Sequence, residues 1–153
     1  MPKVSIILPI HQMGGGADFL WRSVNMLTKQ SFQDYELIIT QNGKMAENTN
    51  AGIRRAKGEI IKILYLDDYL LYPTSLEQMV NYFNSHNSKW LICGTDDNPI
   101  PKWTNDIETG NNKLGSPSAL MFLNDNPLLF DERMSWLLDA DLYKRLFVRY
   151  GEP

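Results

Sequence analysis

The sequence predicts an α/β fold with a mostly parallel, twisted sheet flanked by helices. Short continuous apolar runs, typical of strands buried on both faces, alternate with segments whose apolar residues recur at helical spacing. Such alternation is typical of βαβ units, in which right-handed crossovers place helices on the faces of a parallel sheet. We expect a single domain over residues 1–153, because this length fits one domain.

Five apolar runs are the predicted strands. They span residues 4–10, 35–40, 59–66, 89–94 and 117–124. The first three, "VSIILPI", "YELIIT" and "EIIKILYL", are rich in the β-branched and apolar residues that strands favour. The segment from 95 to 116 is polar and rich in turn residues, so we expect a loop there, with at most a short edge strand.

Four segments are predicted to be helical. The first has Leu20, Val24 and Leu27 at helical spacing, with Asp18 as a candidate cap. The others are expected within residues 42–58, from Thr74 or Ser75 through Phe83, and within residues 134–151. Gly58 is expected to end the second helix in the left-handed conformation that glycine adopts readily.

Composition excludes several classes of protein. Hydrophobic residues make up 43% of the chain, which suffices for a core, and charged residues make up 22%. This composition differs from that of disordered chains, which are poor in hydrophobic residues. The net charge of -3 argues against a nucleic-acid partner bound through phosphate neutralisation. Cys93 has no second cysteine to pair with, and its apolar surroundings predict a core residue in a reducing compartment.

The apolar runs are all too short to cross a bilayer, which takes about 20 residues. The first ten residues are strand-like, and their apolar run is too short for a signal peptide with its cleavage site. We therefore expect a cytoplasmic protein, which could work beside a membrane. An oligomer is compatible with the sequence.

Polar residues follow three of the predicted strands. These are Pro9-Ile10-His11, Gln41-Asn42-Gly43 and Asp67-Asp68. In open α/β sheets ligands bind at the carboxyl ends of the strands, so the three clusters should share one edge. A histidine ring can stack on a base, an amide can read a base edge, and carboxylates can bind Mg²⁺ or Mn²⁺.

The pair Asp67-Asp68 has a plainer interpretation, namely an exposed turn in which one Asp caps the next helix. Its place at the end of a buried strand favours a cation site, because two carboxylates in a partly apolar setting would otherwise repel each other. Asp96-Asp97 is a second such pair, but the following Asn-Pro is typical of an ordinary loop.

Four segments taken together resemble family 2 glycosyltransferases of the GT-A fold, in a short version. They are "VSIILPIH", "SVNMLTKQSFQDYELIIT", "NAGIRRAKGEIIKILYLDDYLLYP" and "DERMSWLLDADLYKRL". Their order and spacing over residues 4 to 148 carry the resemblance, since each segment alone is weak. The resemblance implies a Rossmann-like sheet and an inverting, metal-dependent transfer of a sugar from a nucleoside diphosphate to a hydroxyl acceptor.

The resemblance also implies roles for the acidic residues. Asp67 and Asp68 match the carboxylates that hold Mn²⁺ or Mg²⁺ against the donor diphosphate. Asp139 matches the general base, and Asp141 is the alternative base two positions along. For Asp139 the competing interpretation is a helix N-cap. Trp136 is either the floor of the acceptor site or a core anchor.

The nucleotide contacts implied by the resemblance are Pro9, His11, Gln41, Asn42, Asn50 and Asp67. A UDP-sugar is the expected donor, and the acceptor would be a hydroxyl of a glycan, lipid or protein. Three positions depart from the family pattern: Gln41 replaces an Asp that reads uracil, Thr49 replaces an Arg, and Tyr65 replaces an Asp. The Gln41 amide can still read a base edge, because it both donates and accepts hydrogen bonds.

Two other functions remain open at this point. The departures from the family pattern are compatible with a catalytically silent GT-A-like module that binds a nucleotide, a glycan or a partner. A nucleotidyltransferase would also use carboxylates at strand ends. However, "MGGGA" at residues 13–17 lacks the ending of a phosphate-binding loop.

Overall fold

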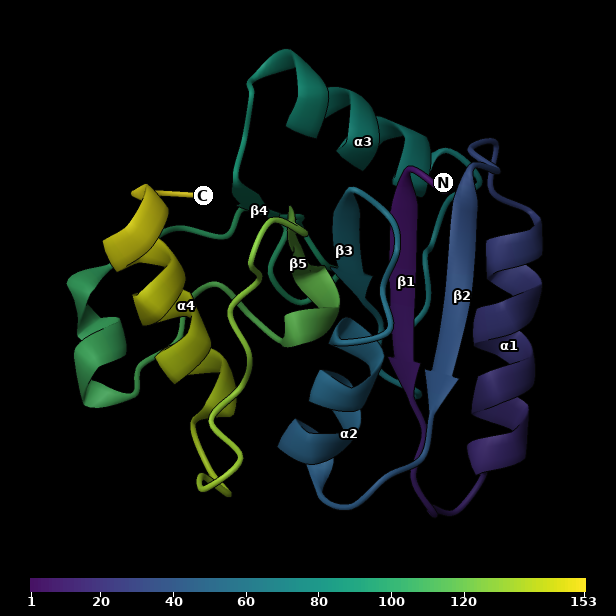
Figure 1. Ribbon diagram of the computed structural model, residues 1–153, viewed down its shortest axis with the longest axis horizontal. Helices are drawn as coiled ribbons and strands as arrows, with labels where there is room; N and C mark the ends of the chain where they lie inside the picture. The colour runs from purple at the N-terminus through teal and green to yellow at the C-terminus, as the bar shows by residue number, and fades with distance from the viewer.

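The computed structural model describes residues 1–153 as one five-stranded sheet with helices on both faces (Figure 1). The strands are β1 (Val4–Pro9), β2 (Tyr35–Thr40), β3 (Ile60–Ile63), β4 (Trp90–Ile92) and β5 (Leu120–Leu123). The α-helices are α1 (Gly16–Thr28), α2 (Met45–Ile53), α3 (Ser75–Ser85) and α4 (Leu138–Tyr150). Two short 3₁₀ helices are η1 (Asn105–Thr109) and η2 (Pro117–Ala119). Every predicted strand and helix is present, most of them shorter than expected.

The sheet has the strand order β2-β1-β3-β5-β4. β1 pairs in parallel with β2 and with β3, whereas β5 is antiparallel to both β3 and β4. Consequently β4 runs in the same direction as the first three strands, and only β5 is reversed. The prediction of a mostly parallel sheet is confirmed.

The register of the strands brings the predicted clusters to the same edge. Pro9 is paired with Thr40, and Ile7 is paired with Ile63. The residues that follow β1, β2 and β3 therefore leave the sheet together. In Figure 1 the arrowheads of β1 and β2 point to the edge at which α2 and α4 begin. We call this the carboxyl edge of the sheet.

Each face of the sheet has its own core. One cluster packs α2, α4 and η1 against side chains such as Ile61 and Ile63. The other packs α1 and α3 against the alternate residues Ile60 and Leu64. All four of these side chains are at most 1% exposed. Burying an Ile or Leu side chain contributes roughly 1.5–3 kcal/mol, so these faces fix the positions of the helices.

Two glycines are required by the backbone. Gly43 has a φ of 62°, and a Cβ there would lie 1.9 Å from Glu47 Oε2. Gly58 does not have the left-handed conformation that we expected, because it is absent from the residues with positive φ. A Cβ at Gly58 would instead lie 2.6 Å from the backbone N of Ser5. Gly58 is needed because the chain passes close to β1 as it enters β3.

Other local predictions need correction. Asp18 does not cap α1, because the N-cap is Gly15 and Asp18 lies within the first turn. The loop predicted over residues 95–116 is confirmed, because this segment has no strand, but the short 3₁₀ helix η1 within it was not predicted. Cys93 is half-buried at the edge of the α1/α3 core, not inside it. No helix has both the length and the apolar character needed to cross a membrane.

Candidate functional site

The ends of β1 and β2 are held together by Asn48, a buried residue of α2. Its Nδ2 donates to the carbonyl of Ile10 at 2.9 Å, and its Oδ1 accepts from the backbone N of Asn42 at 2.9 Å. The hydroxyl of Thr40 donates to the Asn48 carbonyl at 3.0 Å. Because Asn48 satisfies these backbone groups, the side chains of Gln41 and Asn42 are left exposed at the carboxyl edge.

Four of the predicted nucleotide contacts lie near one another, and Asn50 does not join them. Pro9, His11, Gln41 and Asn42 lie at the carboxyl edge, and His11 borders a hollow of about 230 Å³. Asn50 is different, because it is fully buried and its side chain is occupied. Its Nδ2 donates to the Phe130 carbonyl and to Glu132 Oε1, both at 2.9 Å, and its Oδ1 accepts from the Phe130 backbone N. The structure gives Asn50 a structural contact, and its nucleotide contact stays a prediction.

The backbone of Asp67 and Asp68 is anchored to α1. The Arg22 guanidinium donates to the Asp67 carbonyl at 2.6 Å, and the Ser23 hydroxyl donates to the Asp68 carbonyl at 2.6 Å. Neither carboxylate takes part in an ion pair. The loop is therefore held through its backbone, and both acidic side chains are free to bind a ligand.

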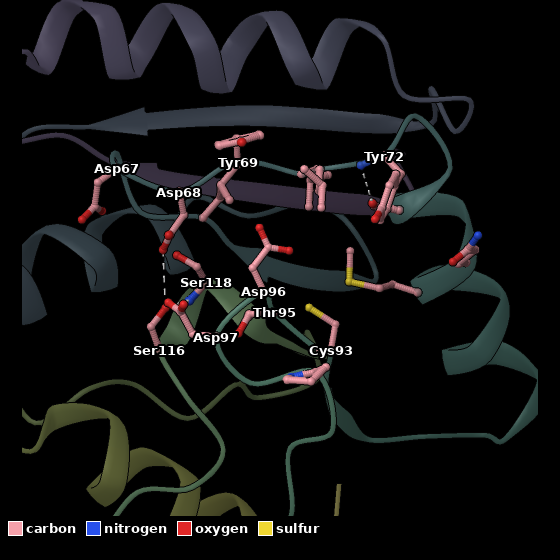
Figure 2. Close-up of a pocket in the computed structure, with 18 residues that line it drawn as sticks. Asp67, Asp68, Tyr69, Tyr72, Cys93, Thr95, Asp96, Asp97, Ser116 and Ser118 are labelled. Carbon is pink, nitrogen blue, oxygen red and sulfur yellow. Dashed lines mark hydrogen bonds between the residues drawn. The ribbon is translucent and has the colours of Figure 1, made fainter.

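The two carboxylates face different directions. In Figure 2 the side chain of Asp68 points toward Ser116, whose hydroxyl donates to Asp68 Oδ2 at 3.5 Å, while Asp67 lies to one side. Neither residue caps α3, because its N-cap is Thr74, so the cap interpretation is wrong. The turn itself is confirmed, since residues 66–67 form a turn in which Asp67 is exposed.

No three His, Cys, Asp or Glu side chains converge as a metal cluster would. The donor set nevertheless fits Mg²⁺ or Mn²⁺, because these cations prefer oxygen ligands and often take one or two protein carboxylates plus substrate phosphates.

A cavity of about 540 Å³ adjoins this pair on the α1/α3 face of the sheet (Figure 2). Four carboxylates line it, those of Asp67, Asp68, Asp96 and Asp97, and no Lys, Arg or His does. The expectation that Asp96-Asp97 is an ordinary loop pair was therefore incomplete, since β4 delivers it to the same cavity. An anionic ligand here would need a bound cation to offset the repulsion.

A buried lysine lies close to this cavity. Lys62, in the middle of β3, is 0% exposed, and its ammonium donates to the carbonyl of Ser118. Burial lowers the pKa of Lys62 from its ordinary value, while the charges of Cys93 and Asp68 act in the opposite direction. Sequence reasoning missed Lys62, because a lysine within an apolar strand has no local feature that distinguishes a buried from an exposed side chain.

The two candidate bases have different partners. Asp139 Oδ2 accepts a hydrogen bond from Asn112 Nδ2 at 2.6 Å. Asp141 Oδ2 is paired with the Arg145 guanidinium one turn along α4, at 2.5 Å and 2.9 Å. The N-cap of α4 is Leu137, so the interpretation of Asp139 as a helix cap is wrong. Trp136 is 79% exposed, which excludes the core-anchor interpretation and leaves the acceptor-site prediction open.

Asn112 belongs to a segment, residues 112–118, that extends from Asp139 to Asp68. The carbonyl of Gly115 accepts from Asn112 Nδ2 at 2.9 Å and from the Tyr143 hydroxyl at 3.2 Å. At the other end the Ser118 hydroxyl accepts from the backbone N of Tyr65 at 2.8 Å. We call residues 112–118 the bridging segment. No sequence pattern pointed to it.

Tyr65, at the start of the Asp67-Asp68 loop, has a buried hydroxyl without a hydrogen-bond partner. Burial raises the pKa of Tyr65 to about 12, the charge of Asp139 raises it further and the nearby Thr49 hydroxyl lowers it. The Thr49 hydroxyl donates to the Met45 carbonyl at 2.8 Å and makes no hydrogen bond of normal geometry to Tyr65. Burial also raises the pKa of Tyr143 well above its ordinary value, again with a contribution from Asp139. Both phenols are therefore neutral at physiological pH beside the Asp139 carboxylate.

Comparison with known proteins supports the fold. The chain is 26% identical to an uncharacterized glycosyltransferase of Rickettsia bellii, over 60% of this chain and 16% of that protein. No model of a known protein family matches the chain. In sequence, then, the chain is similar to a glycosyltransferase over a small part of that protein's length.

Solved structures match over most of the chain. TarS 1-349 of S. aureus in complex with UDP matches 98% of this chain and 56% of its own length, with a TM-score of 0.74 and 16% identity. The mannosyltransferase PcManGT of Pyrobaculum calidifontis, in complex with GDP-Man and Mn²⁺, matches 97% of this chain and 53% of its own length, with a TM-score of 0.71 and 13% identity. The fold is thus of the GT-A type, and the chain spans about half the length of these enzymes.

Proposed function

We propose that this chain is a metal-dependent, inverting glycosyltransferase of family 2 that transfers a sugar from a nucleoside diphosphate to a hydroxyl acceptor. One observation carries the proposal: the bridging segment contacts both Asp68 and Asp139 at the carboxyl edge of the sheet. The proposed cation ligand Asp68 and the proposed base Asp139, 71 positions apart in the sequence (139 − 68), are thereby linked through one segment. The sequence similarity to a glycosyltransferase supports the same function.

In this mechanism Asp139 accepts the proton of the acceptor hydroxyl. The acceptor oxygen attacks the anomeric carbon, a new glycosidic C–O bond forms, and the bond from that carbon to the diphosphate oxygen breaks. A single displacement of this kind inverts the configuration. Asp139 fits the task better than Asp141, because the Arg145 guanidinium occupies the Asp141 carboxylate.

Asp67 and Asp68 would hold Mn²⁺ or Mg²⁺, which when bound acts as a Lewis acid toward the leaving diphosphate. The excess of carboxylates in the adjoining cavity supports this requirement, since a diphosphate alone would be repelled. PcManGT is described in complex with Mn²⁺, which is compatible with the proposal.

We propose a UDP-sugar as donor, with His11 stacking on the base and Gln41 or Asn42 reading its edge. Pro9 would border the base and Asp67 would contact the nucleotide. TarS complexes contain UDP and UDP-GlcNAc, while the mannosyltransferase complex contains GDP-Man, so both nucleotides belong in the test. The acceptor would be a hydroxyl of a glycan, lipid or protein near Trp136. We propose a cytoplasmic location, which includes the surface of a membrane.

The test is a panel of UDP- and GDP-sugars incubated with the purified chain, with and without Mn²⁺ or Mg²⁺. We expect metal-dependent release of nucleoside diphosphate from one donor, and loss of that release in Asp68→Asn. Metal-dependent nucleotide binding without turnover of any donor would identify a catalytically silent module instead. Absence of both turnover and metal-dependent binding would contradict the proposal.

A further inference from the structure

We propose that Asn112 is a positioning residue for Asp139, and that the bridging segment couples this carboxylate to the Asp67-Asp68 loop. The catalytic part of the inference rests on the proposed function. The structural part, that Asn112 governs the state of the Asp139 carboxylate, does not. Asn112 has no catalytic contact of its own in this scheme and acts through Asp139.

Every polar atom of the Asn112 side chain has a defined partner. Nδ2 donates to Asp139 Oδ2 at 2.6 Å and to the Gly115 carbonyl at 2.9 Å, and Oδ1 accepts from the backbone N of Leu114 at 2.9 Å. This set fixes the orientation of the amide, because a flipped amide would place Oδ1 against the carboxylate and NH₂ against a backbone N–H. Asn112 can therefore direct one oxygen of Asp139 and leave the other oxygen free.

The bridging segment that carries Asn112 is anchored both in the core and to α4. Leu114 is 2% exposed and packs into the α2/α4 core, and the Tyr143 hydroxyl of α4 donates to the Gly115 carbonyl at 3.2 Å. Asp139 and Tyr143 are one turn apart on the same helix. The helix that bears the carboxylate thus also holds the loop that orients it.

The other end of the bridging segment contacts the Asp67-Asp68 loop. The Ser116 hydroxyl donates to Asp68 Oδ2 at 3.5 Å, and the Ser118 hydroxyl accepts from the Tyr65 backbone N at 2.8 Å. Lys62 donates to the Ser118 carbonyl from within β3. Since seven residues carry all these contacts, a shift of the segment would move the Asp139 partner and the Asp68 partner together.

A neutral amide suits the orientation of a general base. An ion pair would occupy the carboxylate, as Arg145 occupies Asp141 through two hydrogen bonds to Oδ2, whereas Asn112 brings no charge and contacts only one oxygen of Asp139. Asn112 from the bridging segment is the hydrogen-bond partner of Asp139, and Tyr65 and Tyr143 are near enough for the charge of Asp139 to raise their pKa values. All three are uncharged at neutral pH, and Asp139 forms no ion pair.

The test compares Asn112→Asp with the matched control Asn111→Asp, which adds the same charge at the exposed neighbouring residue. Asn112→Asp keeps the shape of the side chain but places a second carboxylate beside Asp139. Two carboxylates at this distance share a proton. The first readout is the pH titration of the Asp139 carboxyl carbon by NMR, with the signal assigned by its loss in Asp139→Asn.

We expect the midpoint of the Asp139 titration to move upward by about one pH unit or more in Asn112→Asp, and to stay in place in Asn111→Asp. This readout needs no catalytic activity, so it decides the structural part even if the proposed function fails. An Asp139 titration that is the same in both variants would overturn the inference.

The second readout is transfer with the donor identified by the panel. We expect Asn112→Ala to lower kcat by about 10-fold or more with little change in the donor KM, as removal of an orienting partner does elsewhere. In an Asp139→Asn background the same substitution should cost nothing further, because its effect passes through Asp139. Equal losses in both backgrounds, or a loss confined to KM, would overturn the positioning role.

Discussion

Asp139 and Asp141 lie two residues apart in the first turn of α4, yet their surroundings differ in kind. Asp139 accepts a hydrogen bond from the neutral amide of Asn112, whereas Asp141 is paired with the guanidinium of Arg145. One partner comes from a loop 27 positions away, and the other from the next turn of the same helix. Residue type and helical turn are therefore the same, and the two carboxylates differ in the partner that occupies them.

The difference gives the two carboxylates different expected roles, one in chemistry for Asp139 and one in helix stability for Asp141. An ion pair one turn apart on a partly exposed helix contributes only a few tenths of a kcal/mol to helix stability. The Asn112 amide, by contrast, orients the Asp139 carboxylate through one oxygen and adds no charge beside it. The comparison predicts which substitutions should affect chemistry and which should affect only the helix.

The largest effect is expected from replacing the two carboxylates in turn. Asp139→Asn should lower the transfer rate by about 100-fold or more, because a general base typically contributes 10²–10⁴-fold. Asp141→Asn should retain the rate within a few-fold, and steady-state kinetics with the active donor will measure both. A greater loss in Asp141→Asn than in Asp139→Asn would reverse the assignment of the base.

An intermediate effect is expected from the two acidic pairs in the cavity. Asp68→Asn should raise the Mn²⁺ concentration for half-maximal nucleotide binding by about 10-fold or more, because it removes one of two carboxylate ligands. Asp96→Asn, at an exposed residue that lines the same cavity, should leave this concentration almost unchanged. Calorimetric titration with UDP and Mn²⁺ gives both values, and equal effects would place the cation between the pairs.

The smallest effect is expected from the two tyrosines whose charged forms Asp139 disfavours. Tyr143→Phe should lower the free energy of unfolding by about 1 kcal/mol, since it removes the hydrogen bond to the Gly115 carbonyl. Tyr65→Phe should cost nothing or stabilise the fold, because its buried hydroxyl has no partner. Urea denaturation of the two variants measures the difference. A similar loss in both would mean that the Tyr65 hydroxyl has a partner in solution.

Much of the fold follows from local patterns in the sequence. The apolar runs of β1 and β2 and the helical spacing of Leu76, Met79 and Phe83 in α3 depend only on neighbouring residues, and each was predicted close to its observed bounds. β3 was predicted in the right place, but it covers only Ile60–Ile63 of the expected residues 59–66. The parallel arrangement follows because helices separate these strands. The conformation of Gly58 was predicted wrongly, because its glycine is required by contact with β1 and not by a turn.

The candidate site was predictable only at the strand ends. His11, Gln41 and Asp67 follow strands whose shared edge can be inferred from topology. The contacts of Asn48, Lys62 and Asn112 join residues 38, 56 and 27 positions apart, and nothing in their local sequence indicates them. Asparagine in a polar segment is typical of turns, so the sequence gives Asn112 no distinctive role. Its contact with Asp139 arises because the reversed strand β5 brings the preceding loop to α4.

The reversal of β5 has a consequence for how this region can vary. A loop that precedes an antiparallel strand reaches the same edge as the loops that follow the parallel strands, so the chain between β4 and β5 both leaves from and returns to the carboxyl edge. Insertions and deletions between Gly94 and Pro99, which line the cavity, would therefore reshape its rim without changing the pairing of any strand. We expect this stretch to be where substrate preference can diverge most freely between proteins that share the sheet.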